Sequence, residues 1–226
     1  MAGRLEGKRV LVTQADDYMG PTSVKVFRAE GAEVIEDRTD LTNPGAAKAI
    51  VEAAGDVDVL LANLAAFNQA GRKIDAIDDQ TFAEMFEIMV YPLHRLVRAI
   101  APQMIERKAG KVIVYGSASP LRGIPSLAAY SSARGAQMGS ARATGTELAP
   151  HNIQVNLIAQ NWVESDTYFP QEIREHPKFV VRMRAEVPAG RLARPEEDVS
   201  LAVFLASNES DYFVGQCIPF TGGWVQ

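Results

Sequence analysis

Three side chains between residues 117 and 134 are spaced so that they could move a proton together. Ser117 follows an apolar run that is typical of a buried strand, and Tyr130 and Arg134 are four residues apart in a helical pattern rich in alanine and glycine. Residues four apart lie on the same face of a helix, so we expect the phenol and the guanidinium to be neighbours. The same spacing occurs in ordinary surface pairs, and the rest of the chain has to decide between the two interpretations.

The chemistry that suits this group is base catalysis by a tyrosine. A free tyrosine has a pKa of about 10, which is too high for a base at neutral pH. A fixed cation nearby favours the phenolate and lowers that pKa, and an arginine supplies the charge without titrating itself. A serine hydroxyl can hold a substrate oxygen while the phenolate takes its proton. The sequence therefore predicts Ser117, Tyr130 and Arg134 as a catalytic group.

Strands and helices alternate along the chain, which predicts a parallel sheet covered by helices. The apolar runs at 8–13, 32–36, 57–63, 111–116, 153–158 and 216–220 are predicted strands. Helices are predicted at about 21–30, 44–54, 130–148 and 195–207. The pattern at 79–107 is either one helix or two, because Pro92 and Pro102 would bend or break it. Residues 160–190 are expected to be irregular.

The 226 residues contain no linker and no internal repeat. We therefore predict a single domain over residues 1–226, a doubly wound α/β sheet of the Rossmann type. In such a sheet the ligand crevice lies at the carboxyl ends of the strands, where Ser117 and the segment after residue 158 fall.

The composition excludes several classes of protein. A net charge of −5 with scattered Lys and Arg argues against a nucleic-acid partner, and the absence of an 18-residue apolar run or a signal-like start argues against a membrane. A lone cysteine, Cys217, rules out an internal disulfide, suits the cytoplasm and is expected to be a core thiol. His94, His151 and His176 are too isolated to predict a metal site and are expected to be structural.

The turn after the first predicted strand lacks the glycines that a dinucleotide needs. In dinucleotide-binding domains, glycines let the backbone approach the pyrophosphate at the start of the next helix. Here the turn at 13–20 contains only Gly20, and the bulky Tyr18 precedes it. Asp16 and Asp17 add negative charges that repel a diphosphate. Tyr18 is therefore either a packing residue or a side chain that fills the cofactor site and walls a smaller one.

Over its whole length the sequence resembles the short-chain dehydrogenase/reductase superfamily, and within it the halohydrin dehalogenases. The resemblance is carried by the motifs Ser-x12-Tyr-x3-Arg at 117–134 and Thr-x4-Tyr-x-Gly at 13–20, with arginine in place of the usual lysine. Other departures from the reductase pattern agree with it. Residues 62–65 read Ala-Asn-Leu-Ala, Met89 stands where the reductases carry a proton-relay asparagine, and residues 160–161 read Gln-Asn.

The resemblance implies an enzyme that needs no cofactor and converts vicinal haloalcohols into epoxides, halide and a proton. Ser117 would bind the substrate hydroxyl, Tyr130 would take its proton with Arg134 beside it, and the alkoxide would displace the halide in line. The reverse reaction, epoxide opening by small anions such as azide, cyanide or nitrite, is implied as well. The family also implies a homotetramer formed through the helical patterns at 79–107 and 130–148.

The halide pocket is expected between the first-turn aromatic and the loop after the strand at 153–158. The predicted lining is Tyr18, Gln160, Asn161, Trp162 and Val163, and backbone N–H groups in such a loop can bind an anion. Tyr168 and Phe169 either close the pocket or only pack beside it. Side chains near 64–69 and 165–170 are expected to shape the substrate pocket.

Two other functions stay open. The first is an NAD(P)-dependent oxidoreductase with a divergent turn, for which Glu36 and Asp37 at the end of the second strand would supply the acid that binds a ribose. Strand ends are also often acidic for no such reason. The second is a non-catalytic protein of the same fold, in which Tyr130→Phe would change no turnover.

Overall fold

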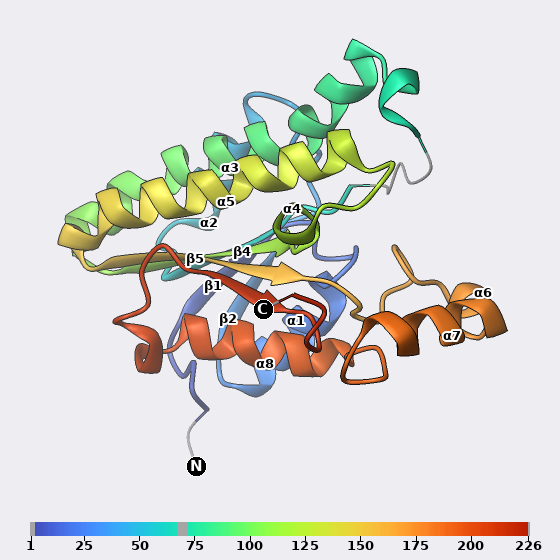
Figure 1. Ribbon diagram of the computed structural model, residues 1–226. Coiled ribbons are helices and arrows are strands. Elements are labelled where there is room, and N and C mark those ends of the chain that lie inside the picture. Colours follow the sequence, from blue (N-terminus) through green and yellow to red (C-terminus); the bar gives the residue numbers. More distant parts are fainter. Residues whose placement is uncertain (1–2, 67–71, 226) are drawn as a thin grey trace.

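The computed structural model describes residues 3–66 and 72–225, and its centre is a parallel β-sheet (Figure 1). The strand order is β2-β1-β3-β4-β5-β6, and every neighbouring pair is parallel. The chain starts in the sheet with β1, moves to one edge with β2, and then builds the other side from β3 onward. The predicted doubly wound sheet is confirmed. Its strands are β1 (Arg9–Val12), β2 (Glu33–Glu36), β3 (Val59–Asn63), β4 (Gly110–Ser117), β5 (Ile153–Gln160) and β6 (Cys217–Phe220).

Helices cover both faces of the sheet (Figure 1). One layer consists of α2 (Ala46–Ala54), α3 (Asp79–Arg107) and α5 (Ala128–Leu148), and the other of α1 (Gly20–Ala29) and α8 (Pro195–Ala206). Three further helices, α4 (Ser119–Arg122), α6 (Gln171–Arg174) and α7 (Pro177–Glu186), lie in the connections that follow β4 and β5. Among the described residues, no helix has both the length and the apolar character that crossing a bilayer requires.

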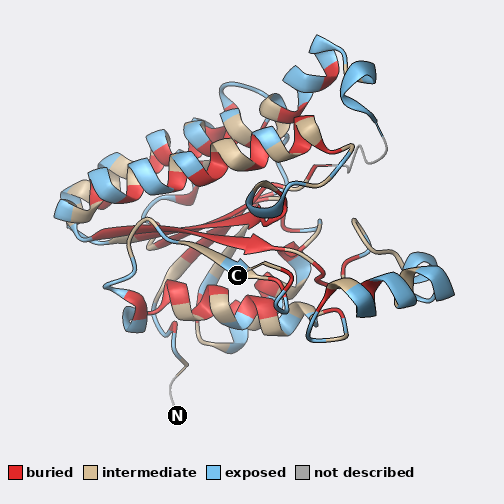
Figure 2. Ribbon diagram, viewed as in Figure 1, coloured by how far each residue is buried: buried red, intermediate tan, exposed pale blue. Residues whose placement is uncertain are grey.

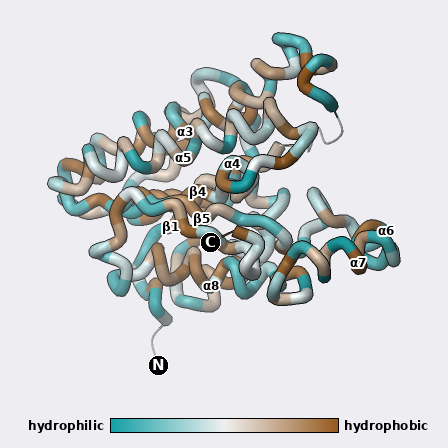
Figure 3. Tube along the Cα trace, in the orientation of Figure 1, coloured by the Kyte–Doolittle hydropathy of each residue, from teal (hydrophilic) through white to brown (hydrophobic). Residues whose placement is uncertain are grey.

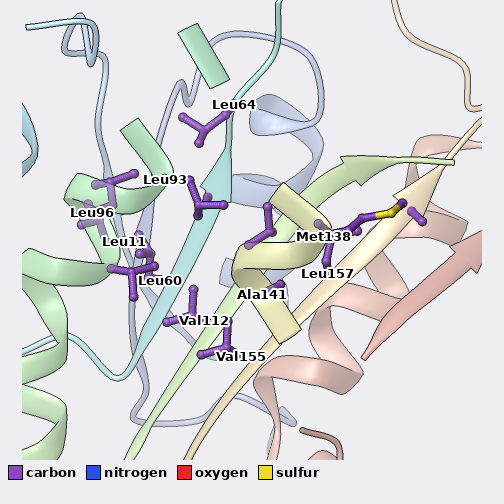
Figure 4. Packing of buried hydrophobic residues seen from close by; sticks show 14 of the residues in the cluster. Leu11, Leu60, Leu64, Leu93, Leu96, Val112, Met138, Ala141, Val155 and Leu157 are labelled. Carbon is purple, nitrogen blue, oxygen red and sulfur yellow. The ribbon is translucent and has the colours of Figure 1, made fainter. Parts of the chain in front are cut away.

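Each helical layer packs on the sheet through its own apolar cluster. The central strands β1, β3, β4 and β5 are buried along almost their whole length, whereas the edge strands β2 and β6 are only partly buried and the long helices bury one side (Figure 2). The hydropathy of the chain follows the same division, with hydrophobic stretches along the central strands (Figure 3). In one cluster, Leu60 and Val112 of the sheet face Leu93 of α3 and Met138 of α5 (Figure 4). Each such large side chain contributes about 1.5–3 kcal/mol when it is fully buried.

The pattern at 79–107 forms one helix, not two, although it contains Pro92 and Pro102. A proline inside a helix removes one backbone hydrogen bond and favours a kink or an end. Here the helix continues because its inner face is held on both sides of the first proline. Met89 and Leu93 are buried within four residues of each other, and Ile100 extends the same face.

The expectation of an irregular segment over 160–190 is wrong. Residues 171–174 and 177–186 form α6 and α7, and the short α4 at 119–122 is a further helix that was not predicted. Pro177 is compatible with the first turn of α7, and the His176 ring accepts a hydrogen bond from the Lys178 backbone at 3.2 Å. The proline that looks like a helix breaker in the sequence thus lies at the start of the helix. His176 caps the helix, which gives this residue a structural role.

The strand register brings several polar residues to one edge of the sheet. Asn63 of β3 is paired with Tyr115 of β4, and Ser117 of β4 is paired with Gln160 of β5. Because parallel strands end at the same edge, these side chains gather where a ligand crevice is expected. At the other edge strand, Cys217 is half-buried and packs against the core, as expected of a core thiol.

Candidate active site

A cavity of about 640 Å³ lies at the carboxyl ends of the central strands. It is bounded by the first turn, the segment from β4 to α5, and the segment from β5 to α7. Seven of the eight residues selected from the sequence line it: Tyr18, Ser117, Tyr130, Gln160, Asn161, Trp162 and Val163. Arg134 is the exception, since it lies behind Tyr130 and is almost fully buried.

Ser117 is held in place by the end of its strand. It is the last residue of β4, and its Oγ accepts a hydrogen bond of 3.1 Å from the backbone N–H of Ser119 at the start of α4. This bond uses an acceptor site of the hydroxyl and leaves its proton free to donate. Ser117 can therefore present a hydrogen-bond donor to an oxygen in the cavity.

Tyr130 and Arg134 meet as their spacing on α5 predicts. The guanidinium carbon of Arg134 lies 5.1 Å from the centre of the Tyr130 ring. Both residues are buried, with 8% of Tyr130 and 1% of Arg134 exposed. In such a place the cation is poorly screened by water, so its field acts strongly on the phenol.

The Arg134 guanidinium is held by neutral acceptors. Nη1 donates to the backbone oxygen of Tyr115 at 3.1 Å and to Oε1 of Gln137 at 2.9 Å, while Nη2 donates to the hydroxyl of Tyr168 at 3.2 Å. Gln137 is in turn fixed by a 2.9 Å bond from its amide to the backbone oxygen of Met89. Since these acceptors carry no full charge, none of them cancels the positive charge beside Tyr130.

Gln137 was not predicted as a site residue, although its spacing from Arg134 in the sequence could have identified it. Residues three apart on a helix are neighbours, so Gln137 is on the face that carries Arg134. Met89, which stands at the position of the relay asparagine in the reductases, contributes only its backbone oxygen to this network.

Two further phenols line the cavity, and in the structure each is hydrogen-bonded within the protein. The Tyr168 hydroxyl donates to the backbone oxygen of Ala66 at 2.9 Å, and the Tyr18 hydroxyl donates to Oε1 of Gln160 at 2.7 Å. Burial raises the pKa of both phenols, and for Tyr168 the neighbouring Tyr130 adds to this effect. They are therefore neutral walls of the cavity, and their rings meet edge to face at 4.9 Å.

The first turn is folded tightly and directs Tyr18 into the cavity. The amide of Asn63 donates to the backbone oxygens of Gln14 and Asp17, at 2.9 Å each, and so ties the turn to the end of β3. Gln14 and Tyr18 both have positive φ values, 45° and 52°. Glycine adopts such a left-handed conformation more easily than other residues, and here two residues with large side chains adopt it.

The residues of this turn do not fit a dinucleotide pyrophosphate. A pyrophosphate needs glycines in the turn so that the backbone can approach it closely. Here the turn carries the side chain of Tyr18, which extends across to Gln160 on β5. At the end of β2, Glu36 forms ion pairs with Arg28 and Arg38, and Asp37 accepts hydrogen bonds from Thr39. Glu36 is thus engaged within the protein, whereas Oδ2 of Asp37 has no hydrogen-bond partner among the described residues.

The segment at 160–163 differs in part from the expected loop. Gln160 is the last residue of β5, so only the three residues after it leave the strand. The backbone N–H of Asn161 donates to Phe220 at 3.1 Å and is not free for an anion. Trp162 has a φ of 60°, and its ring stacks on Phe169 with centroids 5.7 Å apart. Its buried Nε1 has no hydrogen-bond acceptor among the described residues.

The sequence left open whether Tyr168 and Phe169 close the pocket or pack beside it, and in the structure both line the cavity, together with Phe179 of α7. Phe179 was missed because its helix was not predicted. Of the segment at 64–69, Ala66 bonds Tyr168 through its backbone, whereas residues 67–69 lie outside the described residues. Within the described ranges, no cluster of three or more metal-ligating side chains occurs.

The chain is similar to known proteins over almost its full length. A family profile described as enoyl-(acyl carrier protein) reductase matches residues 2–225. The chain is 30% identical to a galactitol 2-dehydrogenase of Agrobacterium fabrum, over 96% of this chain and 88% of that protein. It is 27% identical to a 3-oxoacyl-(acyl-carrier-protein) reductase of Vibrio cholerae, over 97% and 98% of the two chains.

Solved structures show the same fold with two kinds of chemistry. A structure described as a dehalogenation enzyme has a TM-score of 0.91, is 29% identical and covers 100% of both chains. A gluconate 5-dehydrogenase from Burkholderia cenocepacia in complex with NADP and tartrate has a TM-score of 0.89. At 23% identity over 98% of this chain and 96% of that one, the second likeness shows the fold alone.

Proposed function

The chain belongs to the short-chain dehydrogenase/reductase superfamily, and we propose that within it the protein is a halohydrin dehalogenase that works without a cofactor. The observation that carries this proposal is the position of Tyr18. Its phenol crosses from the glycine-poor first turn to Gln160, and a cavity of about 640 Å³ lies beside Tyr18, Ser117 and Tyr130. The likeness to a dehalogenation enzyme at 29% identity supports the same function.

The proposed reaction begins with proton transfer from the substrate hydroxyl. Ser117 donates a hydrogen bond to the substrate oxygen and holds it next to Tyr130. The Tyr130 phenolate, stabilised by Arg134, takes the hydroxyl proton. We assign this step to Tyr130 because burial raises the pKa of the Tyr18 and Tyr168 phenols, which keeps both of them neutral and unsuited to act as bases.

Ring closure follows on the same substrate. The alkoxide oxygen forms a bond to the adjacent carbon, the carbon–halogen bond breaks, and the halogen leaves with the bonding electron pair. Products are the epoxide, a halide ion and the proton now on Tyr130, which passes to solvent. Because nucleophile and leaving group are in one molecule, the enzyme has only to hold oxygen, carbon and halogen in line.

The departing halide needs donors and an apolar wall, and the lining of the cavity includes candidates for both. Trp162 has a buried Nε1 without an acceptor, so an anion there would satisfy it. Val163 and the Tyr18 ring supply apolar surface, and Asn161 is available through its side chain. In the reverse direction, small anions such as azide bound at this place would open an epoxide, with Tyr130 returning the proton.

The test is bromide release from a simple vicinal bromoalcohol with no nucleotide present, comparing the unmodified protein with Tyr130→Phe. A matched control is Tyr91→Phe, because Tyr91 also has an arginine four residues later, Arg95, at 5.5 Å from its ring, but is 44% exposed. Bromide release that is lost in Tyr130→Phe and kept in Tyr91→Phe is the expected result. Equal release from all three proteins would contradict the assignment of the base.

The second candidate function is NAD(P)-dependent oxidation or reduction, favoured by the family profile and by the dehydrogenase relatives. It requires binding of a dinucleotide, which is measured directly by titrating NADH or NADPH and following nucleotide fluorescence. Binding in the micromolar range together with nucleotide-dependent turnover would replace the dehalogenase proposal. Silence in both assays would favour a non-catalytic protein of the same fold.

We also propose that the protein associates as a homotetramer through α3 and α5. The outer face of α5 carries small residues at helical spacing, Ser132, Ala136 and Gly139, and a side chain added at Gly139 would meet open space. Small residues allow two helices to approach closely. Sedimentation analysis of the purified protein, compared with Gly139→Arg, tests this assembly, and a monomer at micromolar concentration would contradict it.

A further inference from the structure

A buried acid is connected to the cavity through two side chains that come from different parts of the chain. Asp198 lies in the first turn of α8 and is fully buried. The amide nitrogen of Gln160 donates to Oδ2 of Asp198, and the amide oxygen of the same residue accepts from the hydroxyl of Tyr18. Gln160 and Tyr18 line the cavity, whereas Asp198 does not.

The surroundings of Asp198 disfavour a negative charge. Its second oxygen, Oδ1, has no hydrogen-bond partner among the described residues. Burial raises the pKa of the Asp198 carboxyl well above its ordinary value. The phenols of Tyr18 and Tyr115 are close enough to feel its charge, and the Tyr115 hydroxyl is bonded to Ser23 at 3.0 Å.

The charged groups of the same helix do not compensate this charge. Glu197, the preceding residue, is paired with Arg191 at 2.7 Å and with Arg194 at 3.7 Å, and Glu196 is exposed. The arginines are therefore engaged by Glu197. A carboxyl group that is removed from water and has no cation beside it is more stable as the neutral acid.

The protonation of this carboxyl decides which way the hydrogen bonds run. A carboxylate can only accept, so the Gln160 amide must turn its nitrogen to Asp198 and its oxygen to Tyr18. The Tyr18 hydroxyl then gives its only proton to Gln160 and presents lone pairs to the cavity, and this is the arrangement that the structure contains. A neutral carboxylic acid can donate to the amide oxygen, which turns the amide nitrogen toward Tyr18. The Tyr18 proton is then free to point into the cavity.

We propose that Asp198 is a positioning residue that, as a neutral acid, orients the Gln160 amide so that Tyr18 donates a hydrogen bond to a small anion in the cavity. The inference rests on the proposed dehalogenase function, because it describes the place where halide leaves and where azide or a similar anion enters. Loss of the Asp198 proton reverses the direction of these hydrogen bonds, so that the Tyr18 hydroxyl presents an acceptor to the cavity in place of a donor. Anion binding is thus coupled to a proton held outside the cavity.

The test measures anion binding without turnover, by titrating sodium bromide or sodium azide and following tryptophan fluorescence, since Trp162 lines the cavity. The variants are Asp198→Asn, whose amide can donate as the neutral acid does, and Asp198→Leu, which cannot form hydrogen bonds. Glu196→Gln is the matched control, with the same change of charge on an exposed neighbour. We expect binding within about 3-fold of the unmodified protein for Asp198→Asn and Glu196→Gln, and a loss of about 10-fold or more for Asp198→Leu.

The pH dependence separates this role from a merely structural one. In the unmodified protein the dissociation constant for bromide should rise about tenfold per pH unit once Asp198 loses its proton, and in Asp198→Asn this rise should be absent. The infrared difference between these two proteins should contain the carbonyl band of a protonated carboxylic acid at pH 7. A carboxylate band there would overturn the inference, and this measurement does not depend on whether Asp198→Leu folds.

The outcomes distinguish this inference from the function on which it rests. If bromide binds with the expected pattern but is not released from bromoalcohols, the anion site is supported and the dehalogenase function is refuted. Bromide release together with unchanged bromide binding in Asp198→Leu would refute the role of Asp198 and leave the dehalogenase standing. Failure of the unmodified protein to bind either anion would also refute the role of Asp198.

Discussion

Replacing Arg134 by glutamine should remove most of the activity, and the structure sets the size of the effect. The guanidinium carbon lies 5.1 Å from the centre of the Tyr130 ring. At this distance and an effective dielectric constant of about 20, a unit cation stabilises a phenolate by about 3 kcal/mol. If the phenolate takes the proton in the rate-limiting step, kcat should fall by about two orders of magnitude in Arg134→Gln.

The variant Arg134→Lys separates charge from geometry. Lysine keeps the charge but cannot bond Tyr115, Gln137 and Tyr168 with one planar group, as Arg134 does. We therefore expect its kcat to lie between those of the unmodified protein and Arg134→Gln.

The assay is the initial rate of bromide release at a saturating concentration of a vicinal bromoalcohol, measured from pH 6 to 9. Arg95→Gln is the control, since it removes an arginine from the other pair with the same spacing. Unchanged kcat in Arg134→Gln, or an equal loss in Arg95→Gln, would refute the electrostatic reasoning.

Three further changes probe the supports of the site. Gln137→Leu should lower kcat by about 10-fold with little effect on KM, because Arg134 loses a buried acceptor and can shift; unchanged kcat would argue against this support. Gly20→Ala should destabilise the fold by about 1–3 kcal/mol in urea, since its Cβ would lie 2.4 Å from the backbone oxygen of Gln14; an unchanged unfolding midpoint would be inconsistent with this packing. Burial raises the Asp198 pKa, so the folded state keeps this proton longer than the unfolded chain. Its contribution to stability is complete below the unfolded pKa and is lost as the pH rises toward the folded pKa, by about 1.4 kcal/mol per pH unit. Unfolding by urea at several pH values should show this slope in the unmodified protein, and the same slope in Asp198→Asn would exclude Asp198 as its source.

Much of the fold follows from patterns that are local in the sequence. The apolar runs and the alternating helices are enough to predict a parallel sheet, because each strand of such a sheet is buried on both faces and needs a helix to return the chain. The same reasoning fails over 160–190. There Pro177 looks like a helix breaker but lies in the first turn of α7, where its missing N–H would have no partner, and His176 caps the helix.

The gathering of the site residues also has a sequence basis. Ser117 and Gln160 are the last residues of neighbouring parallel strands, and the first turn follows the end of β1. Topology alone therefore places these residues and the turn at one edge of the sheet. Gln137 could have been found from its position three residues after Arg134. Asp198 could not, because an acid in the first turn of a helix is usually explained by the helix dipole.

The two Tyr-x3-Arg pairs show most clearly what the sequence leaves open. Tyr91 and Arg95 on α3 have the same spacing as Tyr130 and Arg134 on α5, and in both pairs the cation lies over the ring. Residue types and local geometry are therefore equal in the two pairs. They differ in burial, since 44% of Tyr91 is exposed but only 8% of Tyr130. Burial is set by the sheet and by segments that are distant in the sequence, and it decides whether water screens the cation or leaves its field to act on the phenol.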